Sequence, residues 1–147
     1  MVNQAGIING ENPLVSEMES RYLDPMPKQR ITNLAQQYVE RSNRHILDDV
    51  FPLFEVHATY HTSQFGAFEG IESIKKMMSG FFMKFPDVHW AVETYTPESD
   101  DTVVFNFVMK GTDRETGNKI ERHGRESIRF SEAGFIVYVE VDVLTQA

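Results

Sequence analysis

One glutamate stands out because of the residues beside it. A strand predicted over residues 119–131 alternates between two faces, and one face places Glu126 in line with Ile128 and beside Gly124. A carboxyl group in such a place must be paired, hydrated or protonated, and full burial without a partner raises its pKa by up to ~3–5 units. Glu126 is therefore a candidate general acid or base. In the alternative interpretation, Arg122 or another basic group neutralises it in the core.

The other groups available for chemistry follow from composition. The chain of 147 residues contains no cysteine, which excludes a disulfide framework, thiolate catalysis and thiolate metal sites. The five histidines show no metal-ligand spacing with a third carboxylate, so we expect neither a metal nor a cofactor. Any chemistry must therefore rest on carboxyl, phenol and imidazole groups.

Charge and hydropathy limit the partners. Acidic residues outnumber basic ones by 22 to 14, without a basic block, which argues against nucleic acid and anionic membranes as partners. No apolar run approaches the roughly 20 residues of a membrane span, and no targeting signal is present. We therefore expect a cytoplasmic protein.

Three helical segments precede most of the strands and are predicted over residues 28–44, 46–54 and 71–85. The first carries Tyr38 on its apolar stripe, and Pro52 should break or kink the second near Phe51. The third gathers methionine and phenylalanine side chains, Met78 and Phe82 among them, on one side. That arrangement suits a core or a pocket for a greasy, planar ligand.

Five strands are predicted over residues 56–62, 88–96, 102–111, 119–131 and 135–144. Because the connections between the later strands are hairpin-like, helices followed by an antiparallel meander indicate an α+β domain. Both faces of the last strand are mostly apolar, so we expect helices to cover one face of a strongly curved sheet. A second subunit covering the outer face would make a homodimer.

Residues 1–27 differ in composition from the rest and end in a proline-rich segment that disfavours helix. We interpret them as an N-terminal arm, either partly disordered or in contact with a partner subunit through Leu14, Val15 and Met18. The domain itself is predicted over residues 28–147.

These elements resemble the nuclear-transport-factor-2-like superfamily, and within it the SnoaL-like polyketide cyclases and ketosteroid isomerases. The segments that carry the resemblance read YVERSNRHILDDVFPLFEVHATYHTSQFGAFEGIESIKKMM, FFMKFPDV and GRESIRFSEAGFIVYVEVDV. The resemblance covers nearly everything after the arm. It implies a cone-shaped roll in which a curved, mixed but mostly antiparallel sheet and the helices enclose a pocket. The superfamily hosts isomerases, cyclases, dehydratases, hydrolases and non-catalytic modules, so it is specific for fold and poor for function.

The resemblance also implies residue roles. Tyr38 stands where the isomerases keep an oxyanion-hole tyrosine, although plain core packing is the alternative for this side chain. Glu126 stands where the isomerases keep a protonated aspartic acid and the cyclases an acid/base aspartate. Thr62 replaces the proton-abstracting aspartate of the isomerases, and a threonine cannot serve as a base near neutral pH. His61 is the natural substitute, but alternation points it away from the face of Thr62 unless a bulge at Ser63 re-aims it.

Two functions follow as hypotheses. The first is a cofactor-free enzyme that moves protons on a small hydrophobic carbonyl compound, by cyclisation, isomerisation or dehydration. In it Glu126 is the acid or base, Tyr38 donates a hydrogen bond to the enolate oxygen, and His61 or water supplies a further base. The expected pocket wall consists of Thr62, Trp90, Phe107, Met78, Phe82 and Ile128. The alternative is a non-catalytic ligand-binding or dimerisation module that keeps Glu126 in a structural polar network.

Overall fold

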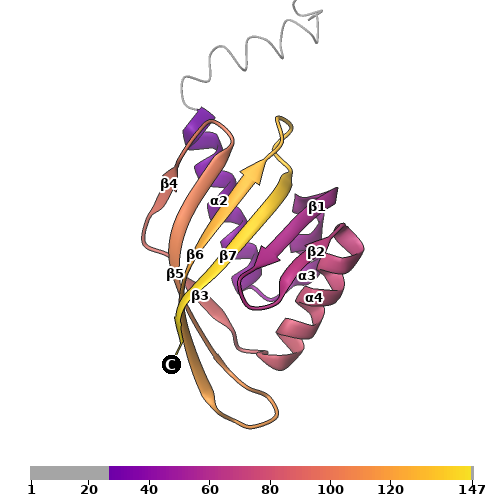
Figure 1. Cartoon of the computed structure of the whole chain (residues 1–147), viewed down its shortest axis with the longest axis vertical. Helices are drawn as coiled ribbons and strands as arrows, with labels where there is room; N and C mark the ends of the chain where they lie inside the picture. The colour runs from indigo at the N-terminus through magenta and orange to yellow at the C-terminus, as the bar shows by residue number, and fades with distance from the viewer. Residues whose placement is uncertain (1–26, 147) are drawn as a thin grey trace, which may run out of the picture.

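The computed structural model of the chain describes residues 27–146 (Figure 1). The expected arm, with its proposed contact residues Leu14, Val15 and Met18, thus lies outside the described residues, except for Pro27. The helical elements are α2 (Pro27–Asn43), α3 (Leu47–Val50), the 3-10 turn η1 (Phe51–Leu53) and α4 (Ile71–Lys84). The strands are β1 (Phe54–Thr62), β2 (Gly66–Glu69), β3 (His89–Ala91), β4 (Tyr95–Pro97), β5 (Thr102–Thr112), β6 (Lys119–Phe130) and β7 (Ile136–Gln146).

The strands form one mixed sheet, which confirms the predicted α+β class. Its order is β2-β1-β7-β6-β5-β3, and β4 pairs with β5 as well. All strand pairs are antiparallel except β1 with β7, which are the first and last strands of the described part and lie side by side in parallel. In the described residues the helices lie to one side of this sheet (Figure 1). Because α2 packs against β4 and β5 while α4 packs against β1 and β2, the two helices cover opposite ends of that face.

Sequence periodicity predicted the long helices and strands closely and missed two irregular places. The segment 88–96 is not one strand, because Trp90 and Tyr95 are five positions apart whereas their partners on β5, Met109 and Phe105, are four positions apart. The chain therefore leaves the ladder between β3 and β4. The short strand β2 was not predicted; it follows the turn after β1, where Gly66 has a φ of 89° that favours glycine.

A bulge in β7 corrects the expected faces of the last strand. Consecutive residues of β6 pair with Ile136 and Tyr138, so Val137 has no partner of its own. Ile136 is therefore buried in the core at 1% exposure, while Phe135 is 46% exposed. With strict alternation Ile136 would share the outer face of Tyr138, so the bulge moves this apolar side chain from that face into the core.

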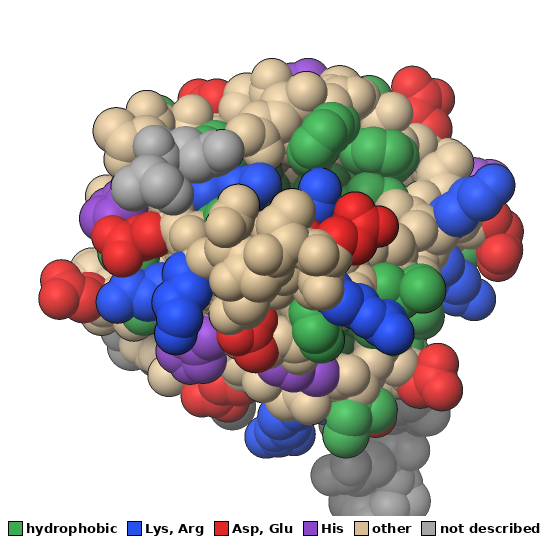
Figure 2. Space-filling view, turned by 90° about the horizontal axis from the view of Figure 1, so that it is seen from below, with side chains coloured by type: hydrophobic (Ala, Val, Ile, Leu, Met, Phe, Trp, Pro, Cys, Tyr) green, Lys and Arg blue, Asp and Glu red, His purple; other side chains and the backbone are tan. Residues whose placement is uncertain are grey.

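The surface shows no single dominant charge on the side seen in Figure 2. Acidic and basic side chains are interspersed there, with small separate groups of hydrophobic side chains between them. None of the helices in residues 27–146 is long and apolar enough to cross a membrane.

Candidate functional site

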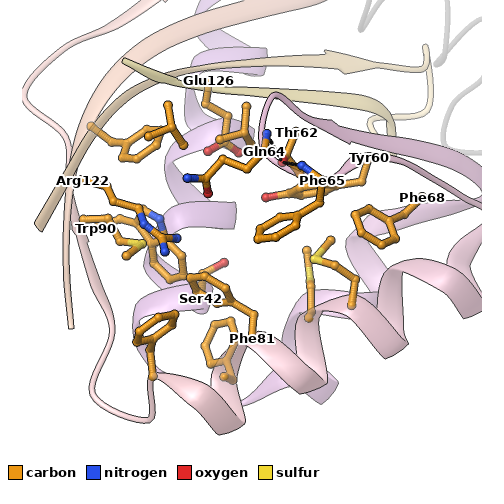
Figure 3. Close-up of a pocket in the computed structure, with 18 of the residues that line it drawn as sticks. Ser42, Tyr60, Thr62, Gln64, Phe65, Phe68, Phe81, Trp90, Arg122 and Glu126 are labelled. Atoms are coloured by element: carbon orange, nitrogen blue, oxygen red, sulfur yellow. Dashed lines mark hydrogen bonds between the residues drawn. The ribbon is translucent and has the colours of Figure 1, made fainter. Parts of the chain in front are cut away.

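A cavity of about 530 Å³ opens between α2, α4 and the inner face of the sheet (Figure 3). Seven residues expected at the site line it: Glu126, Tyr38, Thr62, Trp90, Phe107, Met78 and Phe82. Ile128 lies instead in the core at 0% exposure, packed among residues of α2, β5 and β7. The volume lies within the range of sites that enclose drug-sized molecules.

Glu126 is the acidic residue that this cavity buries. Its side chain points into the cavity from β6 and is 6% exposed (Figure 3). The Oε2 atom is buried and accepts no hydrogen bond from any described residue. Burial raises the pKa of Glu126 from its ordinary value of 4.5 to about 8. A neutral carboxyl is therefore the main form at pH 7, and the alternative of a core ion pair with Arg122 is not observed.

Two tyrosines lie next to this carboxyl. Tyr38, on α2, is 5% exposed, and its hydroxyl is hydrogen-bonded to that of Tyr60 on β1. Burial raises the pKa of both hydroxyls well above their ordinary range, with a further contribution from the charge of Glu126. The two hydroxyls therefore lie together beside the carboxyl of Glu126.

Tyr60 was not among the expected site residues, although the sequence carried a signal for it. Residues two apart on a strand share a face, so Tyr60 had to lie on the side of Thr62. Both line the cavity in the structure. The resemblance drew attention to the position of Thr62 and left its neighbour out.

Thr62, at the position where the isomerases keep a base, stabilises a turn through hydrogen bonds of its side chain. Its Oγ1 accepts hydrogen bonds from the backbone N–H groups of Gln64, at 3.0 Å, and of Phe65, at 3.1 Å (Figure 3). These bonds shape the turn between β1 and β2. Because Gln64 and Phe65 also line the cavity, and Phe65 is 71% exposed, this turn forms part of the cavity mouth.

His61 lies away from the cavity. It sits on β1 opposite Ala67 of β2 and Glu140 of β7, on the other face from Thr62, and it does not line the cavity. The strand does not re-aim it, because Ser63 continues the ladder with a hydrogen bond from its backbone N–H to the carbonyl oxygen of Val141. We therefore assign no catalytic role to His61.

Trp90 is held in the cavity wall by a residue that sequence reasoning did not select. The side chain of Asn43, at the end of α2, accepts from the Trp90 backbone N–H and donates to its carbonyl oxygen, both at 2.9 Å. The indole also stacks on Phe81 of α4 at 5.9 Å between ring centroids. Because Asn43 and Trp90 are 47 residues apart, no local pattern predicts this pairing.

Gly124 makes room for the aromatic wall. A Cβ atom at this position would lie 2.3 Å from Cζ of Phe107, the residue that it faces on β5. The ring of Phe107, which is 4% exposed, occupies the space that the absent side chain leaves.

Arg122 is the second charged group of β6 that enters the cavity (Figure 3). Its guanidinium carbon lies 5.4 Å from the centroid of the Phe85 ring, and its buried Nε has no hydrogen-bond partner. Burial lowers the pKa of this guanidinium, but an arginine remains charged at neutral pH. The site thus combines a neutral carboxyl, two tyrosines and the Arg122 guanidinium in a mostly apolar wall, and Lys76 and Lys84 add two further cations to the lining.

The donor atoms of this site do not make a metal centre. In the part of the chain that the structure describes, no three histidine, aspartate or glutamate side chains gather as metal ligands do. The polar groups of the cavity are those of proton transfer and hydrogen bonding.

Comparisons with known proteins agree with this architecture. Residues 35–139 match the family model of the SnoaL-like domain, and a comparison with curated protein sequences gave no match. Among solved structures, SalBIII is described as an epoxide hydrolase/cyclase-like enzyme with a role in pyran ring formation in the polyether salinomycin. It superposes with a TM-score of 0.73 at 12% identity, over 80% of this chain and 93% of that one.

Two further solved structures share the fold. An NTF2-like protein of unknown function from Exiguobacterium sp. 255-15 has a TM-score of 0.62 at 21% identity, over 80% of this chain and 98% of that one. RV0760c from Mycobacterium tuberculosis, solved in complex with estradiol-17β-hemisuccinate, has a TM-score of 0.66 at 14% identity, over 74% and 88%. With a family model that spans well over half of its length, and with the fold of the NTF2-like structure around a cavity, the chain belongs to the SnoaL-like domain family.

Proposed function

We propose that this SnoaL-like domain is a cofactor-free enzyme that moves protons on a small hydrophobic carbonyl compound, in a cyclisation, isomerisation or dehydration. The observation that carries the proposal is the state of Glu126. Its carboxyl group is buried in an apolar cavity, has an oxygen without a partner, and has its pKa raised by burial to about 8. An acid/base catalyst works best when its pKa lies near the working pH.

Glu126 serves as both base and acid in this mechanism. At pH 7 about a tenth of the molecules carry it ionised, which follows from a pKa of about 8. The carboxylate removes a proton from the carbon next to the substrate carbonyl, and the resulting carboxylic acid returns a proton at the same or another carbon. This mechanism requires no second base. It is therefore compatible with a threonine, Thr62, at the isomerase base position and with the location of His61 outside the cavity.

Tyr60 takes the donor role that the resemblance gave to Tyr38. In this mechanism its O–H donates to the substrate oxygen, where negative charge develops as the enolate forms. Tyr38, whose hydroxyl interacts with that of Tyr60, donates to Tyr60 in turn and strengthens that donation, because chains of hydrogen bonds polarise one another. Tyr38 is then a positioning residue that acts through Tyr60.

The neighbours support small-molecule chemistry in such a cavity. SalBIII is described as epoxide hydrolase/cyclase-like, and the RV0760c structure holds a steroid derivative. The competing function is a non-catalytic binding module, which is favoured by the use of Thr62 as a turn residue in place of a base.

Proton exchange separates the two functions without knowledge of the natural substrate. We would incubate the protein in D₂O with 2-tetralone, a bicyclic ketone with exchangeable C–H bonds next to its carbonyl, and follow the loss of those signals by NMR. The enzyme should accelerate exchange, and Glu126→Gln should abolish the acceleration. Glu121→Gln, the same substitution on the outer face of the same strand, should leave it unchanged. Saturable binding of the ketone with no acceleration would establish the binding module instead.

We also propose that the chain forms a homodimer through the outer face of the sheet. The helices described lie on the inner side, so this face has no cover within residues 27–146 (Figure 1). Tyr138 lies on it, and Leu144 is 61% exposed. A second copy would bury these side chains.

A further inference from the structure

Arg122 is a cation in the cavity wall for which the described residues provide no anionic partner. Its guanidinium packs over the ring of Phe85, and its Nε is buried without an acceptor. The neighbouring acid in sequence, Glu121, lies on the opposite face of β6, where it binds His123 at 2.7 Å. The carboxyl of Glu126 shares the face of Arg122, but it has an oxygen without a partner of its own.

An unpaired cation in a largely apolar cavity is costly unless something satisfies it. The guanidinium is planar and presents its donors in a fixed fork, which matches a carboxylate through two parallel hydrogen bonds. The guanidinium carbon lies 5.4 Å from the centroid of the Phe85 ring, within the distance of a cation–π contact. This contact holds the guanidinium at the cavity, where its donors face the space that an anionic group of a ligand would occupy (Figure 3).

We propose that Arg122 binds a carboxylate at one end of the ligand, so that the substrates are hydrophobic carbonyl compounds with an anionic terminus. The assignment of this ligand as a substrate rests on the proposed function, whereas the anion site stands on binding alone. Arg122 and Glu126 are four residues apart on one strand, which separates their Cα atoms by about 13 Å at ~3.3 Å per residue. The carboxylate and the reacting carbonyl therefore lie toward different ends of the ligand.

The cavity wall between Arg122 and Glu126 is apolar. Phe107 lies opposite Gly124 on β5, and Met109 and Val141 line the cavity beside them. An elongated apolar body fits this stretch, with its charged end against Arg122. Neutral Glu126 places no opposing charge in the cavity at pH 7.

Trp90 makes the experiment direct, because it is the only tryptophan of the chain and it lines the cavity. Titrations of its fluorescence at pH 7 would compare decanoate with 1-decanol, which has the same chain length and no charge. The wild-type protein should bind decanoate more tightly. Arg122→Met should weaken decanoate binding by about 10- to 100-fold, as for the loss of a charge-assisted bidentate contact, and should leave 1-decanol binding unchanged. Arg129→Met makes the same substitution at an exposed residue on the outer face of the same strand, away from the cavity lining, and should change neither.

Each other outcome overturns the proposal. Equal affinity of the wild-type protein for both ligands, or no binding of decanoate, excludes the anion site without the use of any variant. Equal losses in Arg122→Met and Arg129→Met would reduce the effect to general electrostatics. If Arg122→Met does not fold, Arg122→Lys keeps the charge but not the fork, and should show an intermediate loss for decanoate alone. Glu126→Gln should retain the preference for decanoate, so failure of the proposed catalysis and failure of this anion site give different results.

Discussion

The substitution Glu126→Gln tests the central physical statement about the site, which is that the folded protein keeps this carboxyl neutral. The substitution retains the shape of the side chain and removes its titration. In the unfolded chain the carboxyl ionises near its ordinary pKa of 4.5, and in the folded protein only near 8. Between these values the folded state binds one proton more than the unfolded state, so stability must fall as pH rises.

The magnitude follows from the two pKa values. Their difference corresponds to about 5 kcal/mol when the pH is well above both. About 4 kcal/mol of this free energy of unfolding is lost as the pH rises from 5 to 9. The full contribution of the neutral carboxyl to stability is present only below pH 4.5. Since small domains have a free energy of unfolding of about 5–15 kcal/mol, the change is large enough to measure.

Urea unfolding at pH 5, 7 and 9 would measure this change in the free energy of unfolding, with the wild-type protein and Glu126→Gln compared at each pH. The wild-type protein should lose stability relative to the variant as pH rises, so that Glu126→Gln is the more stable protein at pH 9. Glu121→Gln is the matched control, because Glu121 is on the outer face and its hydrogen bond with His123 holds its pKa below the ordinary value. Parallel pH profiles for the wild-type protein and Glu126→Gln would refute the neutral, buried carboxyl.

Three other predictions follow from the site and the sheet. Tyr60→Phe should slow the exchange of ketone protons by about 10²–10³-fold with little change in KM. Tyr38→Phe should slow it less, because Tyr38 acts through Tyr60. Equal effects of the two variants would contradict the assignment of Tyr60 as the direct donor. Gly124→Ala forces a Cβ against the ring of Phe107 and should lower the free energy of unfolding by about 1–3 kcal/mol in a urea titration. Light scattering should give twice the chain mass for the homodimer, and Tyr138→Glu on the outer face should reduce it to the monomer mass; a wild-type monomer would exclude this interface.

The sequence was most informative where structure is local. Alternation on β6 places residues two apart on one face, and this alone put Glu126 on the inner side with Ile128 and Gly124. The same rule pointed His61 outward, as the structure has it. It does not place Ile136, because a bulge adds a residue to one strand of a pair and strict alternation contains no information about the partner.

Tertiary structure decided everything that depends on which distant segments meet. The bond between Tyr38 and Tyr60 joins a helix to a strand, and Asn43 reaches Trp90 across 47 residues. Whether Arg122 neutralises Glu126 or packs on Phe85 depends on the shape of the cavity, which helices and strands from the whole domain create together. Sequence by itself determined that a carboxyl stands on an apolar face. Only the fold determined that no cation pairs with it there, because its charge state is set by the dielectric and the partners that long-range packing provides.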